Sequence, residues 1–489
     1  MRRILLALAA AAALTVTAFP STAGAAPPSN DAFANANVID PSALPFGDSV
    51  AIDEATTESG ESLGSCTYGS GNAQTVWYSI TPTSSGVLRV SDSASFYYQF
   101  IAVYPQNGSG LSGLGPDIGC ASWAIGSNST TVNVTAGQTY YIQAGSNFAS
   151  SGTISVSVQL ILPPANDDFA GATPVTAVPF SDQADTTAAS VEPNEPTPSC
   201  GYGQSAGTVW YAFTPSTTGS YSASSPWGGF NTQVAAYTGT GLGNLASLGC
   251  QTFGQLLTFH ANAGQTYYLQ VGGIFGSRGT VNLRLDVAPN PVANFFYYPG
   301  DPSIFDTIQF IDQSYDPGQV GIQSWSWDFG DGSASSAASP THAYATDRDY
   351  TVKLTVTTAD GRTATSTQVV HVRTHDVTIS KLTVPQSASS GQTRQITVGV
   401  TDSRYPEMVS VQLLASVPGG GFQQVGVLQQ QVSARGNTRP TTFSFSYTFT
   451  KADASVGKVT FQAIATIVGA RDAQPSDNTV TALPTKVNG

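Results

Sequence analysis

The sequence predicts an all-β protein built from tandem β-sandwich domains, and three observations lead to this fold class. The chain has only 18 Lys and Arg among 489 residues, so it has few of the charged residues that favour helices. It is also rich in β-branched residues, which favour strands. Residues 325–332 read WSWDFGDG, in which large aromatic and polar side chains alternate as in a half-buried strand. A long stretch of sequence also occurs twice in tandem. We therefore expect four tandem β-sandwich domains, jelly-roll-like and Ig-like, after a signal peptide.

Residues 1–25 have the features of a secretory signal peptide. Arg2 and Arg3 precede an apolar run at 4–14, and Ala23-Gly24-Ala25 fits a small-residue cleavage site. The run is too short for a membrane span, so we expect a secreted, extracellular protein without membrane insertion. Removing the leader changes the formal net charge from −13 to −15. Such an acidic chain argues against nucleic acid as a partner, because no basic patch is present to contact phosphates.

The tandem repeat defines two domains of similar length. PPSNDAFANA at 27–36 matches PPANDDFAGA at 163–172, and AGQTYYIQAG at 136–145 matches AGQTYYLQVG at 263–272. TVWYSITPTSSG, which starts at Thr75, matches TVWYAFTPSTTG, which starts at Thr208. We expect domains at 26–161 and 162–287, called repeat 1 and repeat 2 below. The TVWY strand carries bulk on both faces, which predicts a central strand covered on both sides.

The four cysteines fall at equivalent positions, one pair in each repeat. In an exported protein the simplest pairing is Cys66 with Cys120 and Cys200 with Cys250. Each bridge would close a loop of about fifty residues, which the chain-entropy model values at about 4 kcal/mol. A thiolate metal site is the alternative, but the sequence contains no CxxC spacing.

The third segment resembles a known family. WDFGDG, then PTHAY at 340–344 and DYTVKLTV from 349, look like a PKD domain, which is an Ig-like module of secreted and surface proteins. This resemblance covers residues 288–373. Residues 374–489 contain four more β-runs, and their HDVTISKL and ASSGQTRQITVGV segments resemble a CARDB-type Ig-like adhesion module.

The two repeats resemble the bacterial pre-peptidase C-terminal-like β-domains. The shared features are NDxFA, TVWYxFTP, an aromatic–AxY strand and AGxTYYxQ. At residues 96–100 repeat 1 reads FYYQF, and repeat 2 reads GFNTQ, whereas the family has a turn of the Phe-Asp-Thr type. Neither repeat has the aspartate of that turn. The resemblance implies a non-catalytic domain that accompanies secreted enzymes and surface proteins.

The sequence gives no convergent catalytic set, so we do not expect an enzyme. Residues 203–207 match GxSxG, but a nucleophile elbow follows a strand and opens a helix, whereas here a strand follows. The four histidines form no HExxH motif, and a structural role is expected for His342. His371 and His375 flank a strand end, which does not give helical metal-ligand geometry.

Two kinds of binding residue are candidates. Asp312, Asp316 and Asp331 lie in turns, where carboxylates suit Ca²⁺, although aspartate in a turn commonly bonds its own backbone. Calcium is the single cofactor that the sequence leaves open. Trp123 and Trp227 are candidates for a sugar-stacking surface. Trp77, Trp210, Trp325, Trp327 and the FFYY run at 295–298 are expected to pack in the core instead.

The expected function is binding. We expect a secreted, non-catalytic binding or adhesion protein of the cell surface or extracellular matrix, whose partner is an extracellular polysaccharide or protein. An accessory protein that docks a degradative system on its substrate is the alternative, and exposure of Trp123 and Trp227 would favour it. An extracellular hydrolase is a second alternative that the missing catalytic set disfavours. Because the binding assignment rests on analogy between folds, it needs support from a site.

Overall fold

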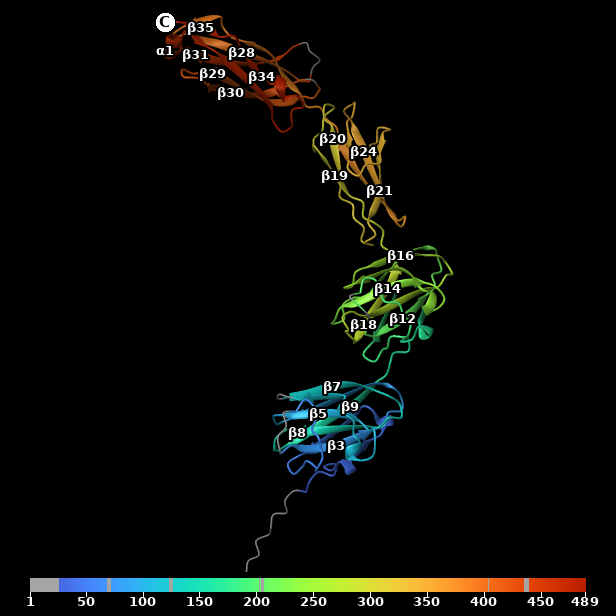
Figure 1. Ribbon diagram of the computed structural model, residues 1–489. Helices are drawn as coiled ribbons and strands as arrows, with labels where there is room; N and C mark the ends of the chain where they lie inside the picture. The colour runs from blue at the N-terminus through green and yellow to red at the C-terminus, as the bar shows by residue number, and fades with distance from the viewer. Residues whose placement is uncertain are drawn as a thin grey trace, which may run out of the picture. The chain divides into compact units, whose positions relative to one another are not determined.

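The computed structural model of the protein describes residues 26–67, 72–122, 126–201, 203, 206–402, 404–434 and 439–489 (Figure 1). Over these residues the chain is almost entirely β-strand, with a short α-helix and a few 3-10 turns. The strands form separate sheets within each of the four sequence segments, and no sheet contains described strands from two segments. This arrangement confirms the predicted all-β fold class of tandem sandwich domains.

The described residues pack into two compact units. The first unit consists of the described residues up to Thr214 together with residues 224–255 and 265–284. The second unit consists of residues 215–223, 256–264 and the described residues of 285–489. Repeat 2 therefore contributes strands to both units. Within the described chain, no helix has the length and apolar character needed to cross a membrane.

Repeat 1 folds into two facing sheets. Its elements are η1 (Phe33–Asn35), β1 (Asn37–Ile39), η2 (Pro41–Ala43), β2 (Phe46–Ala51), β3 (Gln74–Ile80), β4 (Gly86–Ala94), β5 (Gln99–Pro105), η3 (Leu111–Gly113), β6 (Gly119–Ser122), β7 (Gly126–Val134), β8 (Tyr140–Ser146) and β9 (Thr153–Ile161). One sheet has the strand order β1-β3-β8-β5-β6 and the other β2-β9-β4-β7. Tyr78 of β3 and Leu88 of β4 share one buried core, so the two sheets face each other across it.

The TVWY strand is buried on both faces, as its sequence predicts. All seven residues of β3 are buried. Tyr78 packs in the core between the sheets, whereas Trp77 packs on the other side against Phe33, with 5.2 Å between the ring centroids, and against Tyr104. The NDAFA segment therefore covers the outer face of the central strand.

Repeat 2 has the same topology as repeat 1. Its elements are η4 (Phe169–Gly171), β10 (Thr173–Val175), β11 (Phe180–Asp185), β12 (Thr208–Phe213), β13 (Gly219–Ser224), β14 (Thr232–Thr238), η5 (Leu242–Asn244), β15 (Ala246–Thr252), β16 (Leu257–Ala261), β17 (Tyr267–Gly273) and β18 (Thr280–Val287). The strand orders are β10-β12-β17-β14-β15 and β11-β18-β13-β16, which correspond strand for strand to those of repeat 1. The tandem duplication read from the sequence is thus a duplication of a whole sandwich.

A buried carboxylate holds the long loop before β12 in repeat 2. The Gln270 side-chain amide donates to Glu195 Oε1 at 2.8 Å, and the Glu192 backbone N–H donates to Glu195 Oε2 at 2.8 Å. Tyr237 in turn donates its hydroxyl to Gln270 Oε1 at 2.9 Å. Burial raises the pKa of Glu195 above its ordinary value, while these donors oppose that rise. The loop is therefore fastened to the sheet by a satisfied polar network.

Repeat 1 contains the equivalent network. Gln143 donates to Glu61 Oε1 at 2.7 Å, and Tyr104 donates to Gln143 Oε1 at 2.9 Å. The Glu58 backbone N–H completes it by donating to Glu61 Oε2 at 2.8 Å. The repeats therefore share buried polar contacts as well as apolar ones.

Each repeat contains one disulfide, which confirms the pairing expected from the sequence. Cys66 is bonded to Cys120 and Cys200 to Cys250, at sequence separations of 54 and 50. Cys120 lies on β6 and Cys250 on β15, which are the edge strands of the five-stranded sheets. Each bridge therefore attaches the long loop before β3 or β12 to an edge strand.

The third segment is a smaller sandwich. Its strands are β19 (Phe295–Tyr298), β20 (Ile308–Asp312), β21 (Ile322–Asp328), β22 (Ala334–Ser335), β23 (Thr341–His342), β24 (Asp349–Thr358) and β25 (Thr363–His371), in sheets ordered β19-β20-β23 and β22-β21-β24-β25. Trp327 and Phe329 are buried in its core together with Phe295. The predicted aromatic face of WSWDFGDG therefore faces the core, although Trp325 at its start is only partly buried.

The last segment forms three sheets around one core. Its elements are β26 (Val377–Thr383), β27 (Ser387–Ser389), β28 (Thr393–Asp402), β29 (Glu407–Ser416), β30 (Phe422–Val432), β31 (Thr441–Thr448), α1 (Lys451–Val456), β32 (Lys458–Val459), β33 (Phe461–Ile467), η6 (Pro475–Asp477), β34 (Thr479–Thr481) and β35 (Thr485–Asn488). The sheet orders are β26-β28-β31, β27-β35-β32 and β30-β29-β33-β34. A capping box of Thr450 and Asp453 begins α1, and Gly457 ends it with a left-handed backbone.

Candidate functional site

Exposed aromatic side chains gather on three loops at one end of repeat 2. Trp227 lies in the β13–β14 loop and is 73% exposed. Phe253 in the β15–β16 loop and Phe275 in the β17–β18 loop are 50% and 63% exposed. The sequence had singled out Trp227, whereas Phe253 and Phe275 were missed. We call these three side chains the aromatic loop end of repeat 2.

Hydrogen bonds and close packing hold the three loops of repeat 2 together. The Phe253 backbone N–H donates to the Thr232 carbonyl at 3.1 Å, and the Ile274 N–H donates to the Asn231 carbonyl at 3.0 Å. The ring of Phe230 lies so close to Gly273 and Gly279 that a Cβ at either glycine would come within about 3 Å of it. The β13–β14 loop therefore contacts both of the other loops.

Phe253 and Phe275 occupy backbone conformations that phenylalanine seldom adopts. Phe253 has a φ of 57° and Phe275 a φ of 56°, and each is followed by a glycine with positive φ, Gly254 or Gly276. In both turns an i→i+3 backbone hydrogen bond closes the four residues. Two positive φ angles in succession are typical of a type I′ turn, which favours Asn, Asp or Gly at the position that phenylalanine occupies here.

Repeat 1 has a corresponding cluster, the aromatic loop end of repeat 1, made of Tyr97, Tyr98 and Phe148. These side chains are between 42% and 60% exposed. The ring of Tyr98 meets that of Phe148 edge to face, with 4.9 Å between centroids, and lies 6.4 Å from that of Tyr97. The Asn147 N–H also donates to the Tyr98 carbonyl at 3.0 Å. The β4–β5 and β8–β9 loops therefore present one continuous aromatic group.

The two ends correspond at two of their loops, whereas Trp227 aligns with Ala94 and Tyr98 with Asn231. Phe148 and Phe275 are each the third residue after the QAG or QVG that follows AGQTYY, and Trp123 and Phe253 each follow a cysteine by three residues. Trp123 lies outside the described residues, so its predicted role stays a prediction. Comparing the repeats in this way was the signal that could have identified Phe253 from the sequence.

Strained aromatic residues concentrate at these ends. Among the described residues, five non-glycine residues have positive φ, and three of them are Tyr98, Phe253 and Phe275. A left-handed backbone costs a bulky L-residue roughly 1 kcal/mol or more. At these positions the chain carries a backbone cost together with an exposed ring, which is the combination expected where a side chain serves contact with a ligand.

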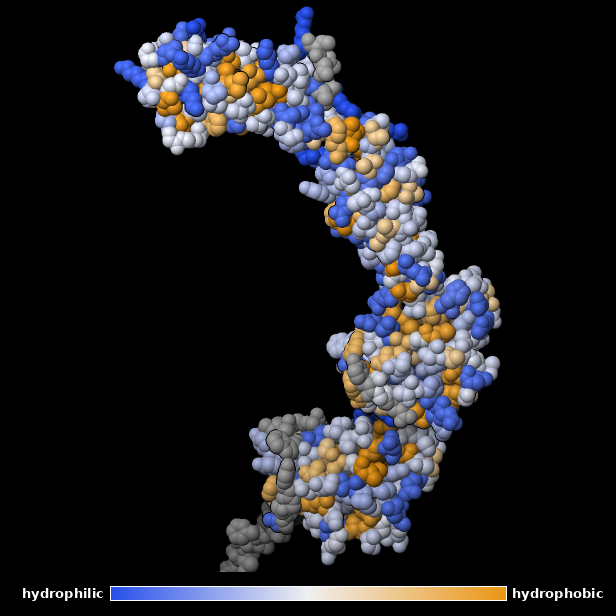
Figure 2. Space-filling view, turned by 45° about the horizontal axis from the view of Figure 1, so that its top comes forward, coloured by the Kyte–Doolittle hydropathy of each residue, from blue (hydrophilic) through white to orange (hydrophobic). Residues whose placement is uncertain are grey.

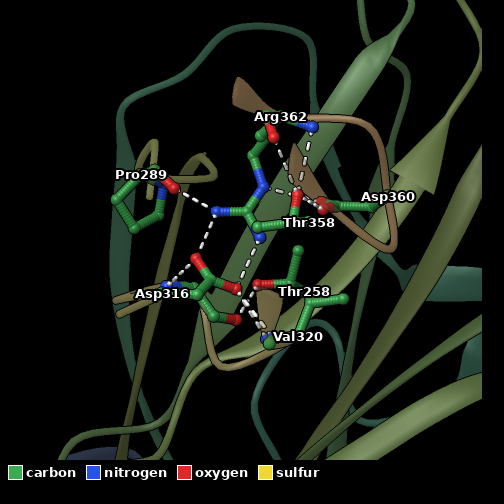
Figure 3. Close-up of polar contacts among 9 residues, drawn as sticks. Thr258, Pro289, Asp316, Val320, Thr358, Asp360 and Arg362 are labelled. Atoms are coloured by element: carbon green, nitrogen blue, oxygen red, sulfur yellow. Dashed lines mark hydrogen bonds and ion pairs between the residues drawn. The ribbon is translucent and has the colours of Figure 1, made fainter. Parts of the chain in front are cut away.

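The candidate calcium ligands each have other partners. Asp316, whose side chain is 1% exposed, receives Arg362 in a bidentate pair with N–O distances of 2.8 and 2.9 Å, and Arg362 also reaches Asp360 and the Pro289 carbonyl (Figure 3). Asp312 accepts the indole N–H of Trp325 at 2.7 Å. Burial opposes the shift, but the hydrogen bonds from Arg362 and the backbone lower the pKa of Asp316.

Asp331 is paired with His342. The Asp331 Oδ2 to His342 Nε2 distance is 2.7 Å, and the imidazole stacks on Phe329 with 4.3 Å between centroids. Although burial opposes it, hydrogen bonds from Ser333 and His342 lower the pKa of Asp331 to about 2. Within the part of the chain that the structure describes, no three His, Cys, Asp or Glu side chains are grouped to hold a metal ion. The three aspartates therefore serve three separate contacts.

Other sequence candidates are distributed between core and surface. Trp77, Trp210 and Trp327 are fully buried, as expected. In the FFYY run Phe295 is buried, whereas Phe296 and Tyr298 are exposed. Ser205 of the GxSxG match lies outside the described residues. The space-filling view shows hydrophobic patches interrupting a largely hydrophilic surface (Figure 2).

Comparison with known proteins identifies one segment. A family model described as PKD domain matches residues 289–373. The PKD1 domain of Vibrio anguillarum Epp is 34% identical, over 18% of this chain and 96% of that chain, with a TM-score of 0.16. The PKD1 domain of the Vibrio cholerae metalloprotease PrtV is also 34% identical, over 18% and 100%, with a TM-score of 0.16.

A longer match involves a solved tetra-tandem repeat from the extending region of a large adhesion protein. It is 14% identical, over 83% of this chain and 96% of that chain, with a TM-score of 0.20. No curated protein matches the chain.

Proposed function

We propose, from the premise that residues 289–373 are a PKD domain, that this protein is a secreted, non-catalytic binding protein of the cell surface or extracellular matrix. The PKD domain fits a binding or accessory role, and the two disulfides fit an extracellular location. The aromatic loop ends of the two repeats are the ligand-contacting surfaces in this proposal.

The observation that carries the proposal is the equivalence of the two ends. Duplicated sandwiches with the same buried framework both expose aromatic rings on the same loops, with strained backbone at Tyr98, Phe253 and Phe275. Loops positioned by a rigid scaffold are common binding surfaces. A binding role explains why aromatic residues stand where the turns favour asparagine or glycine.

The exposure of Trp227 favours a second candidate, an accessory protein that docks an extracellular degradative system on its insoluble substrate. A large, exposed tryptophan on a loop suits attachment to an extended solid surface. The two candidates share the same site and differ in whether an enzyme accompanies the protein. Co-purification of a hydrolase with the secreted protein would select the accessory role.

The test is a pull-down of the secreted chain, residues 26–489, on insoluble chitin, cellulose, peptidoglycan and collagen, with and without Ca²⁺. We expect retention on at least one matrix, and we expect Trp227→Ala to lower it. Phe422→Ala removes an exposed aromatic ring from β30 and serves as the matched control that leaves retention unchanged. Retention that survives combined loss of both aromatic loop ends would refute the proposed surface, and retention on no matrix would refute the proposed function.

A further inference from the structure

We infer that the ligand of both aromatic loop ends is a neutral polysaccharide whose sugar rings stack on the exposed aromatic side chains. We infer in addition that each repeat binds separately, so that one chain attaches at two points. This inference rests on the proposed function and names its ligand class and valency.

The first argument is the absence of charge from the loops. In repeat 1 the residues 95–98 and 147–152 read SFYY and NFASSG, without a charged side chain. In repeat 2 the residues 225–231, 253–256 and 274–279 contain one charge, that of Arg278. The Arg278 guanidinium donates to the Ala189 carbonyl at 2.7 Å and to the Thr187 carbonyl at 3.2 Å. Its charge is therefore directed toward the protein backbone rather than toward a ligand.

Loop residues without an outward-facing charge are notable in a chain of formal net charge −13. An acidic or basic polymer would be recognised by opposite charges at the contact surface. In repeat 1 the Asp53 carboxylate near the β8–β9 loop accepts the Gly152 N–H at 3.2 Å, so it braces the loop base. The described loop residues therefore suit a ligand without ionised groups.

The second argument is the shape of the exposed groups. A pyranose ring has an apolar face of C–H bonds and a rim of hydroxyl groups, so it packs flat on an aromatic face. In repeat 1 the rings of Tyr97, Tyr98 and Phe148 are consecutive neighbours, which provides more than one stacking surface. Asn147 is buried, and the Ser150 hydroxyl bonds the Ser146 hydroxyl at 2.9 Å and the Phe148 carbonyl at 3.2 Å, so these polar side chains shape the loop and leave the rings as its exposed groups.

The third argument is preorganisation. Because type I′ turns fix Phe253 and Phe275 in the left-handed region, their rings are held outward before any ligand arrives. A rigid aromatic side chain loses little conformational entropy on binding. A weak, repetitive ligand such as a neutral glycan benefits most from surfaces that are already formed.

The two-point attachment follows from the duplication. Each end lies on its own sandwich, with its own core and its own disulfide. Two linked sites raise avidity by about 10²- to 10⁴-fold over one site when both engage the same polymer. The valency depends on the independence of the two sandwiches rather than on a particular angle between them.

The variants are chosen so that loss of binding is separable from loss of folding. Phe253→Asn and Phe275→Asn place a residue that tolerates positive φ in each turn, so we expect melting temperatures equal to or above that of the wild type. Tyr98→Asn likewise places a residue that tolerates positive φ in repeat 1, and asparagine is the residue found at the equivalent position 231 of repeat 2. Phe422→Ala is again the control for loss of an exposed ring.

The experiment is native electrophoresis of the full secreted chain through gels that contain hydroxyethylcellulose, mixed-linkage β-glucan, pullulan or polygalacturonate, with collagen-coated plates in parallel. We expect retardation by one of the neutral glycans and none by polygalacturonate. The Phe253→Asn/Phe275→Asn variant should bind at least about tenfold more weakly, as for a binding hot spot. Combining it with Tyr98→Asn and Phe148→Ala should abolish retardation.

The outcomes separate this inference from the proposed function. Binding to collagen or polygalacturonate through the same loop residues would overturn the neutral-glycan assignment and leave the binding function standing. Binding that is as strong as that of the wild type after the loop variants of either repeat alone would overturn the two-point attachment. Binding that is unaffected by all of the loop substitutions would overturn the assignment of the aromatic loop ends as the binding site. A protein that binds none of these polymers and none of the insoluble matrices would overturn the proposed function as well.

Discussion

Phenylalanine has two opposite roles in this protein, and its backbone conformation distinguishes them. Phe100 and Phe213 lie on strands and are fully buried, so their burial contributes about 2 kcal/mol each to folding. Phe253 and Phe275 lie in turns with positive φ and remain exposed. At the residue scale, the strained positions are therefore the ones at which the sequence departs from what stability alone would select.

Asp92 is a buried carboxylate of repeat 1 that makes folding pH-dependent. It is 2% exposed, its Oδ1 accepts the Asn128 N–H at 3.0 Å, and its Oδ2 has no hydrogen-bond partner among the described residues. Burial raises the pKa of Asp92 to about 6 from the ordinary 3.8. Because the folded state binds this proton more tightly, stability is highest below pH 4 and falls as the pH rises through 6.

The expected loss between pH 4 and pH 7 is about 3 kcal/mol, from roughly two pKa units at about 1.4 kcal/mol each. Asp92→Asn should remove this dependence and make repeat 1 more stable than the wild type at pH 7. Repeat 2 has Ser225 at the equivalent position and serves as an internal control. Hydrogen exchange of repeat 1 and repeat 2 peptides at pH 5 and 7, corrected for intrinsic rates, checks this, and equal trends in both repeats would contradict it.

The sequence could predict buried aromatic residues more readily than exposed ones. Period-two alternation placed Trp327 and Phe329 in the core because strand geometry fixes which side faces inward. No such periodicity exists in a turn, so Phe253 could be identified only by comparing the two repeats. Trp227 was a candidate because it lies outside the strand motifs that place the other tryptophans in the core.

At the element scale, side chains that are distant in sequence fasten loops to strands. Arg362, in the turn between β24 and β25, binds Asp316 in the loop between β20 and β21, across 46 residues. The Asp316 carboxylate also accepts the backbone N–H groups of Gly318 at 2.9 Å and Val320 at 2.8 Å. The sequence offered Asp316 as a candidate calcium ligand because aspartate in a turn was visible, whereas the distant arginine that pairs with it was not.

Removing Arg362 should destabilise this sandwich strongly. Arg362→Ala leaves the Asp316 carboxylate buried without its cation, and such a loss typically costs about 3–5 kcal/mol. Arg362→Lys should recover only part, because an ammonium cannot form the bidentate pair. Arg373→Ala is the control: it breaks an exposed pair with Asp349, which is worth at most about 1 kcal/mol. Urea denaturation of the three variants measures the free energy of unfolding. Equal losses of this free energy from Arg362→Ala and Arg373→Ala would contradict a larger contribution from the buried Arg362–Asp316 pair.

At the scale of the whole molecule, the sheets are confined to their own segments, so the modules should respond to damage separately. The disulfides allow a direct test, since each closes about fifty residues within one repeat. Replacing Cys200 and Cys250 by alanine should lower the stability of repeat 2 by about 4 kcal/mol in the chain-entropy model and leave repeat 1 unchanged.

Differential scanning calorimetry of this variant and of the Cys66→Ala/Cys120→Ala variant would check the independence of the repeats. We expect each variant to shift one transition toward lower temperature. A shift of every transition in both variants would mean that the modules unfold cooperatively. The overall organisation was readable from sequence because duplication leaves matching motifs, whereas the loops proposed to contact the ligand are where those motifs diverge.

The equal length of the β4–β5 and β13–β14 segments has a practical consequence. From Gly86 to Tyr104 and from Gly219 to Tyr237 the repeats contain the same number of residues, yet the tips read SFYY in one and GGFN in the other. The same sandwich topology therefore already accommodates two different loop-tip sequences in this chain. The tip residues could be exchanged between the two repeats, or randomised in a library that is selected for binding to a chosen surface. The sandwich would then serve as a scaffold for engineered binding loops.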